Sequence, residues 1–452
     1  TNTGSGTVDL TGTTLILGSN FDIGGGTLTT STTDLTMTAN ATLTSGAAVA
    51  IQTLILGTDH ALTLGSATTD LTVTNVVTFD NASDQIVTGT ADLTLSVAPS
   101  FSDGSITRTA GTITLPSGST IGGGIINVGG STLVLNGNLD VGSATFTAPN
   151  ELSLNGNATL TDTGTITVTT LTLNDLALTL SGTNLTVTSP VTFDNSAEQI
   201  VTGAADLILS NAPTFSDGAI TSTGGVVTIP TGATISGGTL NVNGTTLSIG
   251  GNLDTSGATF ITNTSTNLIL TANALVTADA GITLADLTLN DHALTLGNAT
   301  TDLTIGTSIT GGINTAGEQI ITNGADLSIT PPLTMSDGDI TSSGGVITLA
   351  DGGTISGSGV LNVTGSVLTL TGTLTKTGGT LTTTGSTLSL GGAANLTLNA
   401  GVTFPTLNLN NLGLTLGSAT SDLEVTNAIT FDNSAEQIVT GAADLILSNA
   451  PT

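Results

Sequence analysis

The chain has 452 residues, of which 37% are hydrophobic and only 8% are charged. Its 2 basic residues stand against 32 acidic ones, the formal net charge is −30, and Cys, Trp and Tyr are absent. A chain with so few cations has little with which to neutralise phosphates, so we expect no nucleic acid as a partner, and an anionic membrane surface is a poor one. The lack of cysteine excludes disulfides and thiol chemistry. No apolar run is long enough for a transmembrane helix, so we expect no membrane insertion in this segment.

A long internal repeat dominates the sequence. The stretch FDNSAEQIVTGAADLILSNAPT occurs at residues 193–214 and again, unchanged, at residues 431–452. Diverged copies begin at Phe79 and Ile313, so the period is about 117 residues. A fixed period of this kind indicates a stacked repeat architecture in place of separate globular domains.

Within that period, an apolar–polar–apolar triplet such as LTL or LIL recurs about every 19.5 residues. Two further short apolar pieces lie between successive triplets, for example Phe79 and Ile86 between Leu71 and Leu93. The alternation has period two, which predicts strands and not helices. Three short strands per turn predict an all-β fold, a parallel β-helix (β-solenoid) of about 23 rungs. The first apolar residues of the triplets are Leu15, Leu35, Leu54, Leu71, Leu93, Ile113, Leu133, Leu152, Leu171, Leu185, Leu207, Val227, Leu247, Leu268, Leu287, Leu303, Leu327, Ile347, Leu368, Leu388, Leu407, Leu423 and Leu445.

The spacing of the triplets is irregular at four places. The steps after Leu54, Leu171, Leu287 and Leu407 are shorter than the others, and a long step follows each. These short steps divide the chain into super-repeats at 1–53 (partial), 54–170, 171–286, 287–406 and 407–452 (partial). We expect residues 1–452 to form one continuous solenoid, part of a longer chain, whose inward aliphatic residues stack in a single column. The sequence leaves open whether the short rung lacks a strand.

An acidic residue often precedes the triplet, and on consecutive rungs two such carboxylates should stack ~4.8 Å apart. In water this pair would repel by about 0.9 kcal/mol. One interpretation is a bridging Ca²⁺, which prefers oxygen ligands; the other is a row of solvated carboxylates that keeps the protein soluble. The candidate calcium ligands are Asp70, Asp92, Asp302, Asp326, Asp422 and Asp444. The sequence indicates no other cofactor.

No set of residues predicts catalysis. His60 and His292 occupy a position that is Leu176 and Leu412 in the other copies, which indicates packing. The two basic residues that a polysaccharide lyase would need, Arg108 and Lys376, lie in different repeats. The carboxylates are spread along the chain without an insertion that could form a cleft for a glycosidase. We therefore expect no catalytic residue, and a protein that is not an enzyme.

The triplets, the Gly- and Asn-rich corners and the long near-identical super-repeats resemble the giant β-strand-repeat surface proteins of bacteria. These include passengers of the autotransporter and filamentous-haemagglutinin kind. The resemblance implies a right-handed parallel β-helix, export to the cell surface, and adhesion or filament formation. The acidic, almost lysine-free composition departs from passengers with ordinary charge.

We therefore expect an extracellular or cell-surface structural protein that forms a fibre or stalk with copies of itself. The alternative is an adhesin that binds glycans or surfaces. A more distant alternative is an ice-binding or carbohydrate-active β-helix. Pro116 and Pro230 interrupt the outward column of threonines that a flat ice-binding face would need.

Overall fold

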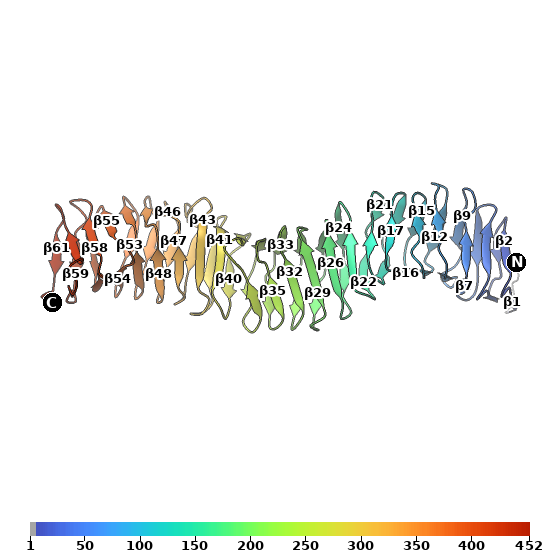
Figure 1. Ribbon diagram of the computed structural model, residues 1–452, viewed down its shortest axis with the longest axis horizontal. Coiled ribbons are helices and arrows are strands. Elements are labelled where there is room, and N and C mark those ends of the chain that lie inside the picture. Colours follow the sequence, from blue (N-terminus) through green and yellow to red (C-terminus); the bar gives the residue numbers. More distant parts are fainter. Residues whose placement is uncertain (1–5) are drawn as a thin grey trace. The chain divides into compact units, whose positions relative to one another are not determined.

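A computed structural model describes residues 6–452 as a right-handed parallel β-solenoid of about 22 turns (Figure 1). The described residues form strands, turns and bends, without a helix. The expected fold class is therefore confirmed. No helix in this part of the chain is long and apolar enough to cross a membrane. The contacts divide the chain into two compact units, one ending at Thr221 and the other beginning at Ser222.

Between Leu71 and Thr147, each turn of the first unit contributes one short strand to each of three parallel sheets. Consecutive strands of one sheet are three elements apart in the chain. The first sheet contains β7 (Val49–Ile51), β10 (Leu71–Val73), β13 (Leu93–Leu95), β16 (Thr112–Leu115), β19 (Thr132–Leu135), β22 (Glu151–Leu154) and β25 (Thr170–Thr172). The second contains β3 (Phe21–Asp22), β6 (Ala41–Thr44), β9 (Ala61–Leu64), β12 (Gln85–Gly89), β15 (Ser105–Arg108), β18 (Ile125–Asn127) and β21 (Thr145–Thr147). The third includes β11 (Thr78–Phe79), β14 (Ser100–Phe101), β17 (Ser119–Ile121), β20 (Leu139–Asp140), β23 (Ala158–Thr161), β26 (Ala177–Ser181) and β29 (Gln199–Gly203).

The second unit is built in the same way. One of its rows of paired strands contains β33 (Val226–Ile229), β36 (Thr246–Ile249), β39 (Asn267–Leu270), β41 (Ile282–Thr288), β43 (Leu303–Ile309), β45 (Leu327–Ile329), β48 (Val346–Leu349), β51 (Val367–Leu370), β54 (Thr387–Leu390) and β57 (Thr406–Asn408). Another contains β34 (Ala233–Ile235), β37 (Leu253–Asp254), β40 (Ala274–Thr277), β42 (Ala293–Leu296), β44 (Gln319–Ile321), β47 (Asp339–Thr341), β50 (Val360–Asn362) and β53 (Thr380–Thr382). A third contains β46 (Leu333–Met335), β49 (Gly353–Ile355), β52 (Thr373–Lys376), β55 (Ala394–Leu398), β58 (Gly413–Leu416) and β60 (Gln437–Val439).

The core of each unit is a stack of aliphatic side chains from successive turns. Leu71, Leu93 and Ile113 pair in register along the first sheet, and at most 1% of each residue is exposed. Their neighbours Thr72 and Thr94 point outward and are half-exposed, as strand alternation requires. Each methylene buried in this stack contributes about 0.8 kcal/mol, and the contribution repeats with every turn.

The prediction that all inward triplet residues stack in a single column is wrong at the short steps. Leu71 pairs with Val49 and not with Leu54, which lies in a separate sheet of β2 (Thr14–Leu17), β5 (Asp34–Met37) and β8 (Thr53–Ile55). The other three short steps behave in the same way. The triplet that follows the step pairs with the apolar piece that comes just before the expected triplet in the chain. The pairs are Leu185 with Ile166, Leu303 with Ile282, and Leu423 with Val402.

The short rung is thus a turn of ordinary length that carries two adjacent strand pieces, and the row of triplets moves from one piece to the other. We call this place a column step. Strand β25 is the seventeenth strand after its equivalent β8, one strand fewer than the expected six rungs of three. Equivalent strands consequently move to a different sheet: β12 follows β3, β6 and β9, whereas its equivalent β29 follows β23 and β26. Paired residues are 19 to 26 positions apart.

Asparagine side chains join the turns on either side of three of the four column steps. Asn138 Oδ1 accepts the N–H of Thr159 at 2.8 Å, and Asn157 Oδ1 accepts the N–H of Ala177 at 2.9 Å. The same pair of bonds recurs from Asn20 and Asn40, and from Asn252 and Asn273. Each side chain satisfies the backbone N–H of a residue at or near the start of a strand on the next turn.

Candidate functional site

A groove opens on the surface of each unit at a column step. In the first unit it is a recess of about 480 Å³, and in the second a recess of about 310 Å³. One wall comes from the strand that ends its sheet and the turn after it, and the other from the next turn of the solenoid. The first groove is lined by Thr170, Leu171, Thr172, Leu173, Asn174, Asp175, Pro190, Thr192, Asp194 and Glu198, and the second by Thr406, Leu407, Asn408, Leu409, Asn410, Asn411, Ala428, Thr430, Asp432 and Glu436.

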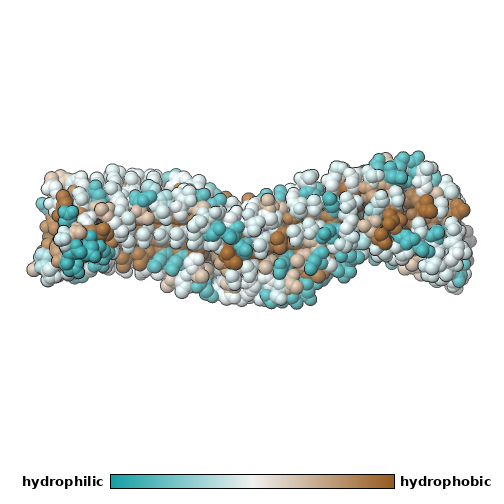
Figure 2. Space-filling view, in the orientation of Figure 1, coloured by the Kyte–Doolittle hydropathy of each residue, from teal (hydrophilic) through white to brown (hydrophobic). Residues whose placement is uncertain are grey.

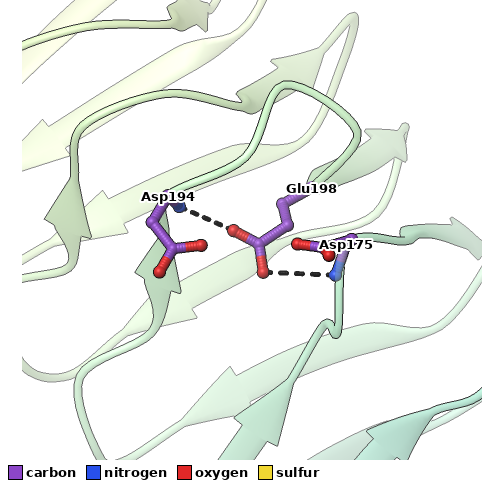
Figure 3. A group of neighbouring side chains, drawn as sticks. All are labelled: Asp175, Asp194 and Glu198. Carbon is purple, nitrogen blue, oxygen red and sulfur yellow. Dashed lines mark hydrogen bonds between the residues drawn. The ribbon is translucent and has the colours of Figure 1, made fainter.

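Three carboxylates meet in the first groove (Figure 3). Asp175, Asp194 and Glu198 each offer an oxygen atom, and these atoms lie within 4.8 Å of one another. Among residues 6–452, no other three His, Cys, Asp or Glu side chains form a group that could hold a metal ion in this way. Asp175 and Asp194 are exposed, whereas Glu198 is buried.

Glu198 braces the two walls against each other. Its Oε2 accepts the N–H groups of Asp194 at 2.6 Å and Asn195 at 3.2 Å, both on its own turn. Its Oε1 faces the N–H of Asp175 on the preceding turn at 3.5 Å. The turn that presents this N–H has two consecutive left-handed residues, Asn174 at φ 54° and Asp175 at φ 61°. Asn and Asp tolerate that conformation better than other side chains with a Cβ.

The same brace occurs in the second unit. Glu436 accepts the N–H of Asn411 at 3.0 Å and that of Asp432 at 2.8 Å. The bond from Asn411 lowers the pKa of Glu436 below its ordinary value. Asn411 and its neighbour Asn410 also have positive φ angles of 63° and 50°. Equivalent acids, Asp84 and Glu318, accept the corresponding N–H groups of their own turns.

The three carboxylates in the groove of the first unit offer oxygen ligands, the type that a hard cation such as Ca²⁺ prefers. Asp175, Asp194 and Glu198 could together contact one such ion. Both oxygens of Glu198 already accept backbone N–H groups, so the carboxylate has a structural role without an ion. In the second unit Asn411 takes the place of Asp175, which keeps an oxygen atom but removes a charge.

The aspartates that the sequence indicated as calcium candidates lie elsewhere, at the starts of strands. They stack in the expected pairs, because Leu71 pairs with Leu93, Leu303 with Leu327, and Leu423 with Leu445. Each first member accepts the backbone N–H of the second at 2.8 Å: Asp70 from Asp92, Asp302 from Asp326, and Asp422 from Asp444. The fold therefore gives these carboxylates a hydrogen-bonding role that the sequence did not suggest.

One of these aspartates also neutralises a buried cation. Arg108 is a core residue of β15, and its side chain is 0% exposed. Its Nη2 lies 2.9 Å from Asp92 Oδ1, and its Nη1 donates to the carbonyl of Thr112 at 2.6 Å. Burial lowers the pKa of Arg108, and the bond to Asp92 opposes that shift. Lys376 is in a different environment, where it donates to Asn399 Oδ1 at 2.6 Å.

The two histidines take no part in the grooves. His60 and His292 are half-buried, and their backbone carbonyls accept the N–H groups of Gln85 and Gln319 on the next turn. The braces themselves were missed in the sequence, although a signal was present. An acidic residue, Asp84, Glu198, Glu318 or Glu436, directly precedes the shared Gln in every copy of the long repeat.

No known protein family, curated protein or solved structure matches this chain.

Proposed function

We propose that this chain is a non-enzymatic structural protein that forms a fibre or stalk outside the cell, with other copies of itself as partners. The observation that carries the proposal is the regularity of the solenoid. Within each unit, paired residues stay 19 to 26 positions apart, and the inward residues are almost all aliphatic. Stability in such a stack comes from contacts between neighbouring turns, so length can increase without a new kind of core.

The surface suits an exposed location. With 2 basic residues and no cysteine, the chain offers few cleavage sites for trypsin-like proteases and no thiol that an oxidising environment would alter. The resemblance to bacterial surface proteins supports the same location. Negative-stain electron microscopy of the purified chain and of its native source tests the proposal. We expect long filaments or bundles of uniform width, and separate particles at every concentration would contradict it.

A second candidate function, adhesion, has one observation in its favour. Two grooves with equivalent polar linings occur at column steps, one in each unit. A recurrent groove could hold a repeating ligand such as a glycan. This alternative is tested by comparing how the natural chain and an Asp194→Asn, Asp432→Asn variant bind to immobilised glycans. If the glycan binds in the grooves, the variant should bind it more weakly. The ice-binding and carbohydrate-active alternatives have no comparable support.

A further inference from the structure

Three strands stop at a column step with one side unpaired. They are β8, β25 and β57, and each is the end strand of its sheet. In a parallel sheet, successive residues direct their N–H and C=O groups alternately to the two neighbouring strands. Thr170 donates its N–H to Asn150 at 3.1 Å on the preceding turn, so Leu171 directs its backbone groups to the other side, where the groove of the first unit lies. An open strand edge of this kind is a template for a further strand.

At the third column step the chain covers the equivalent edge itself. Strand β41 is not an end strand, because β43 of the next turn lies beside it with Ile309 opposite Leu287. Thr310 then donates its N–H to the C=O of Leu287 at 2.9 Å. We call residues 306–310, Gly-Thr-Ser-Ile-Thr, the covering segment. The structure thus contains an example of what fits this position, an extended parallel segment of small and β-branched residues.

The second and fourth column steps leave the position open because the turn that follows them is two residues shorter. At the second step Ser189 donates its N–H to Thr169 at 2.8 Å, and the chain then leaves the edge before it reaches Leu171. At the fourth step the corresponding bond joins Asn427 to Pro405 at 2.8 Å. The shorter turn passes over the edge strand without pairing with it, and the groove is the space that remains.

The size of the grooves agrees with this origin. Leu287 beneath the covering segment is 0% exposed, whereas its equivalents Leu171 and Leu407 are each 4% exposed. The recesses of about 480 and 310 Å³ are within the range of ~300–1,000 Å³ that is typical of ligand sites. Each groove therefore has room for a short extended peptide beside an edge strand.

The far end of the groove is acidic, which selects the charge of an occupant. A strand added in parallel to β25 would point its C-terminal end towards the three carboxylates of the first groove. At the third column step Asn314 stands in place of Asp194, and its Nδ2 donates to the C=O of Gly311 at 2.7 Å, directly after the covering segment. A carboxylate cannot make that bond, because it has no hydrogen to donate. An occupant of the first groove should instead bring a cation at this end.

We propose that the grooves beside β25 and β57 each bind an extended segment of a partner polypeptide, in which small and β-branched residues are followed by lysine or arginine. The segment adds a parallel strand to the open edge, so that main-chain hydrogen bonds supply affinity and the carboxylates select the basic residue. The partner is not another copy of this chain, since Arg108 is buried and Lys376 lies within the paired strand β52. This inference goes beyond the proposed structural function and does not depend on filament formation.

Binding of this kind needs no wide apolar surface. Figure 2 shows one side of the molecule, on which hydrophobic atoms lie in scattered patches among neutral and hydrophilic ones. Backbone groups at an open edge are available whatever the side chains around them, and they give a direction and a register to the added strand.

Hydrogen exchange measured by mass spectrometry tests the proposal, with the peptide acetyl-Gly-Thr-Ser-Ile-Thr-Lys-amide as the probe. Without the peptide, residues 170–174 and 406–410 should exchange faster than residues 286–290, because only the last stretch is covered. In about 1 mM peptide, exchange at 170–174 and 406–410 should slow at least ~3-fold and exchange at 286–290 should not change.

Two altered peptides separate main-chain pairing from charge. A peptide with proline in place of the second threonine lacks the N–H that corresponds to the Thr310 donor, and it should bind at least ~10-fold more weakly. A peptide with glutamate in place of lysine should also bind more weakly, because it brings a like charge to the carboxylates. Asp194→Asn should reduce the preference for the lysine peptide at residues 170–174 and leave it unchanged at residues 406–410.

A variant that fills one groove supplies the matched control. Replacement of residues 188–192 by Gly-Thr-Ser-Ile-Thr-Gly-Gly, the sequence of residues 306–312, gives the second column step the longer turn of the third. Residues 170–174 should then exchange slowly without the peptide and show no further effect of it. The groove at residues 406–410 of the same variant should still respond, which also shows that the second unit is folded.

The inference is overturned if the lysine peptide protects neither groove, or if the proline peptide protects both equally well. A peptide effect at residues 170–174 that persists in the filled variant would also overturn it. If that variant does not fold, the comparison of the two peptides on the natural chain decides. Protection of the same residues by a glycan and not by the peptide would support adhesion in place of this inference.

Discussion

Removal of the Asp92 carboxylate should destabilise the turns around Arg108 more than removal of Arg108 itself. The guanidinium is fully buried, with Nη2 on Asp92 at 2.9 Å, Nη1 on the carbonyl of Thr112, and Nε without a partner. Asp92→Ala would leave this cation in the core with a single hydrogen bond. Breaking a fully buried ion pair costs about 3–5 kcal/mol. The Asp92 side chain is 49% exposed, so water can compensate in part and we expect about 2–3 kcal/mol.

Arg108→Ser should be much milder, because other copies of the repeat use serine at this position. Ser222 and Ser342 are buried there, and their hydroxyls donate to Gly224 at 2.7 Å and Gly344 at 2.6 Å. The serine removes the buried charge and keeps a satisfied polar group. In the Arg108→Ser background, Asp92→Ala should then cost only about 1 kcal/mol, the loss of one hydrogen bond to the Thr112 N–H.

Hydrogen exchange measured by mass spectrometry is the suitable assay, because the chain has no Trp or Tyr for fluorescence and a solenoid opens locally. Peptides that cover residues 86–115 should exchange about 30-fold faster in Asp92→Ala than in the natural chain, as expected for about 2 kcal/mol. The double variant should exchange nearly as slowly as Arg108→Ser alone. If Asp92→Ala accelerates exchange equally in the natural and the Arg108→Ser chains, the ion pair with Arg108 does not explain how this carboxylate stabilises the fold.

Three further predictions concern the grooves and the acidic side chains. Glu198→Ala removes the acceptor of the Asp194 and Asn195 N–H groups, so exchange of that turn should accelerate by an amount equivalent to about 1–2 kcal/mol; an unchanged rate would refute the brace. EDTA should leave the melting temperature unchanged, because the stacked aspartates already accept backbone N–H groups, and a fall of more than about 3 °C would instead reveal a bound cation. The pKa of Glu436 is lower when folded than when unfolded, so its stabilising bonds are present above about pH 4.5 and are lost as the pH falls through the folded pKa. A comparison of Glu436→Gln with the natural chain should therefore show a smaller loss of melting temperature between about pH 5 and pH 3 in the variant, and identical curves would contradict this.

The sequence predicted the solenoid because its two periods reflect different physical requirements. Alternation within a triplet such as Leu71–Val73 follows from the pleat of a strand, and the spacing to Leu93 follows from the length of a turn. Both signals are local, so they can be found without knowing which strands pair.

The column step could not be found in the same way, because two adjacent pieces of one turn carry equally good apolar patterns. Val49–Ile51 and Thr53–Ile55 both alternate, and only the pairing of Leu71 with Val49 distinguishes them. A mean spacing that treats the step as a short rung underestimates the length of a turn and adds one strand to the super-repeat between β8 and β25.

The grooves were missed for a related reason. Asp175 and Glu198 are 23 positions apart and lie on adjacent turns. They meet at a column step, and the triplet spacing did not reveal where that step lies. The stacked aspartates were placed correctly, since each precedes a triplet residue whose pairing is regular. Their acceptance of backbone N–H groups depends on side-chain direction, which spacing alone does not supply.

The column step can be tested most directly with engineered disulfides. In the structure Ala50 pairs with Thr72, whereas a column without a step would place Ile55 beside Thr72. Paired strands lie ~4.8 Å apart, within the range that a disulfide can span. We expect Ala50→Cys with Thr72→Cys to form an intramolecular disulfide under mild oxidation, and Ile55→Cys with Thr72→Cys to remain reduced. The opposite result would contradict the step and the arrangement of turns derived from it.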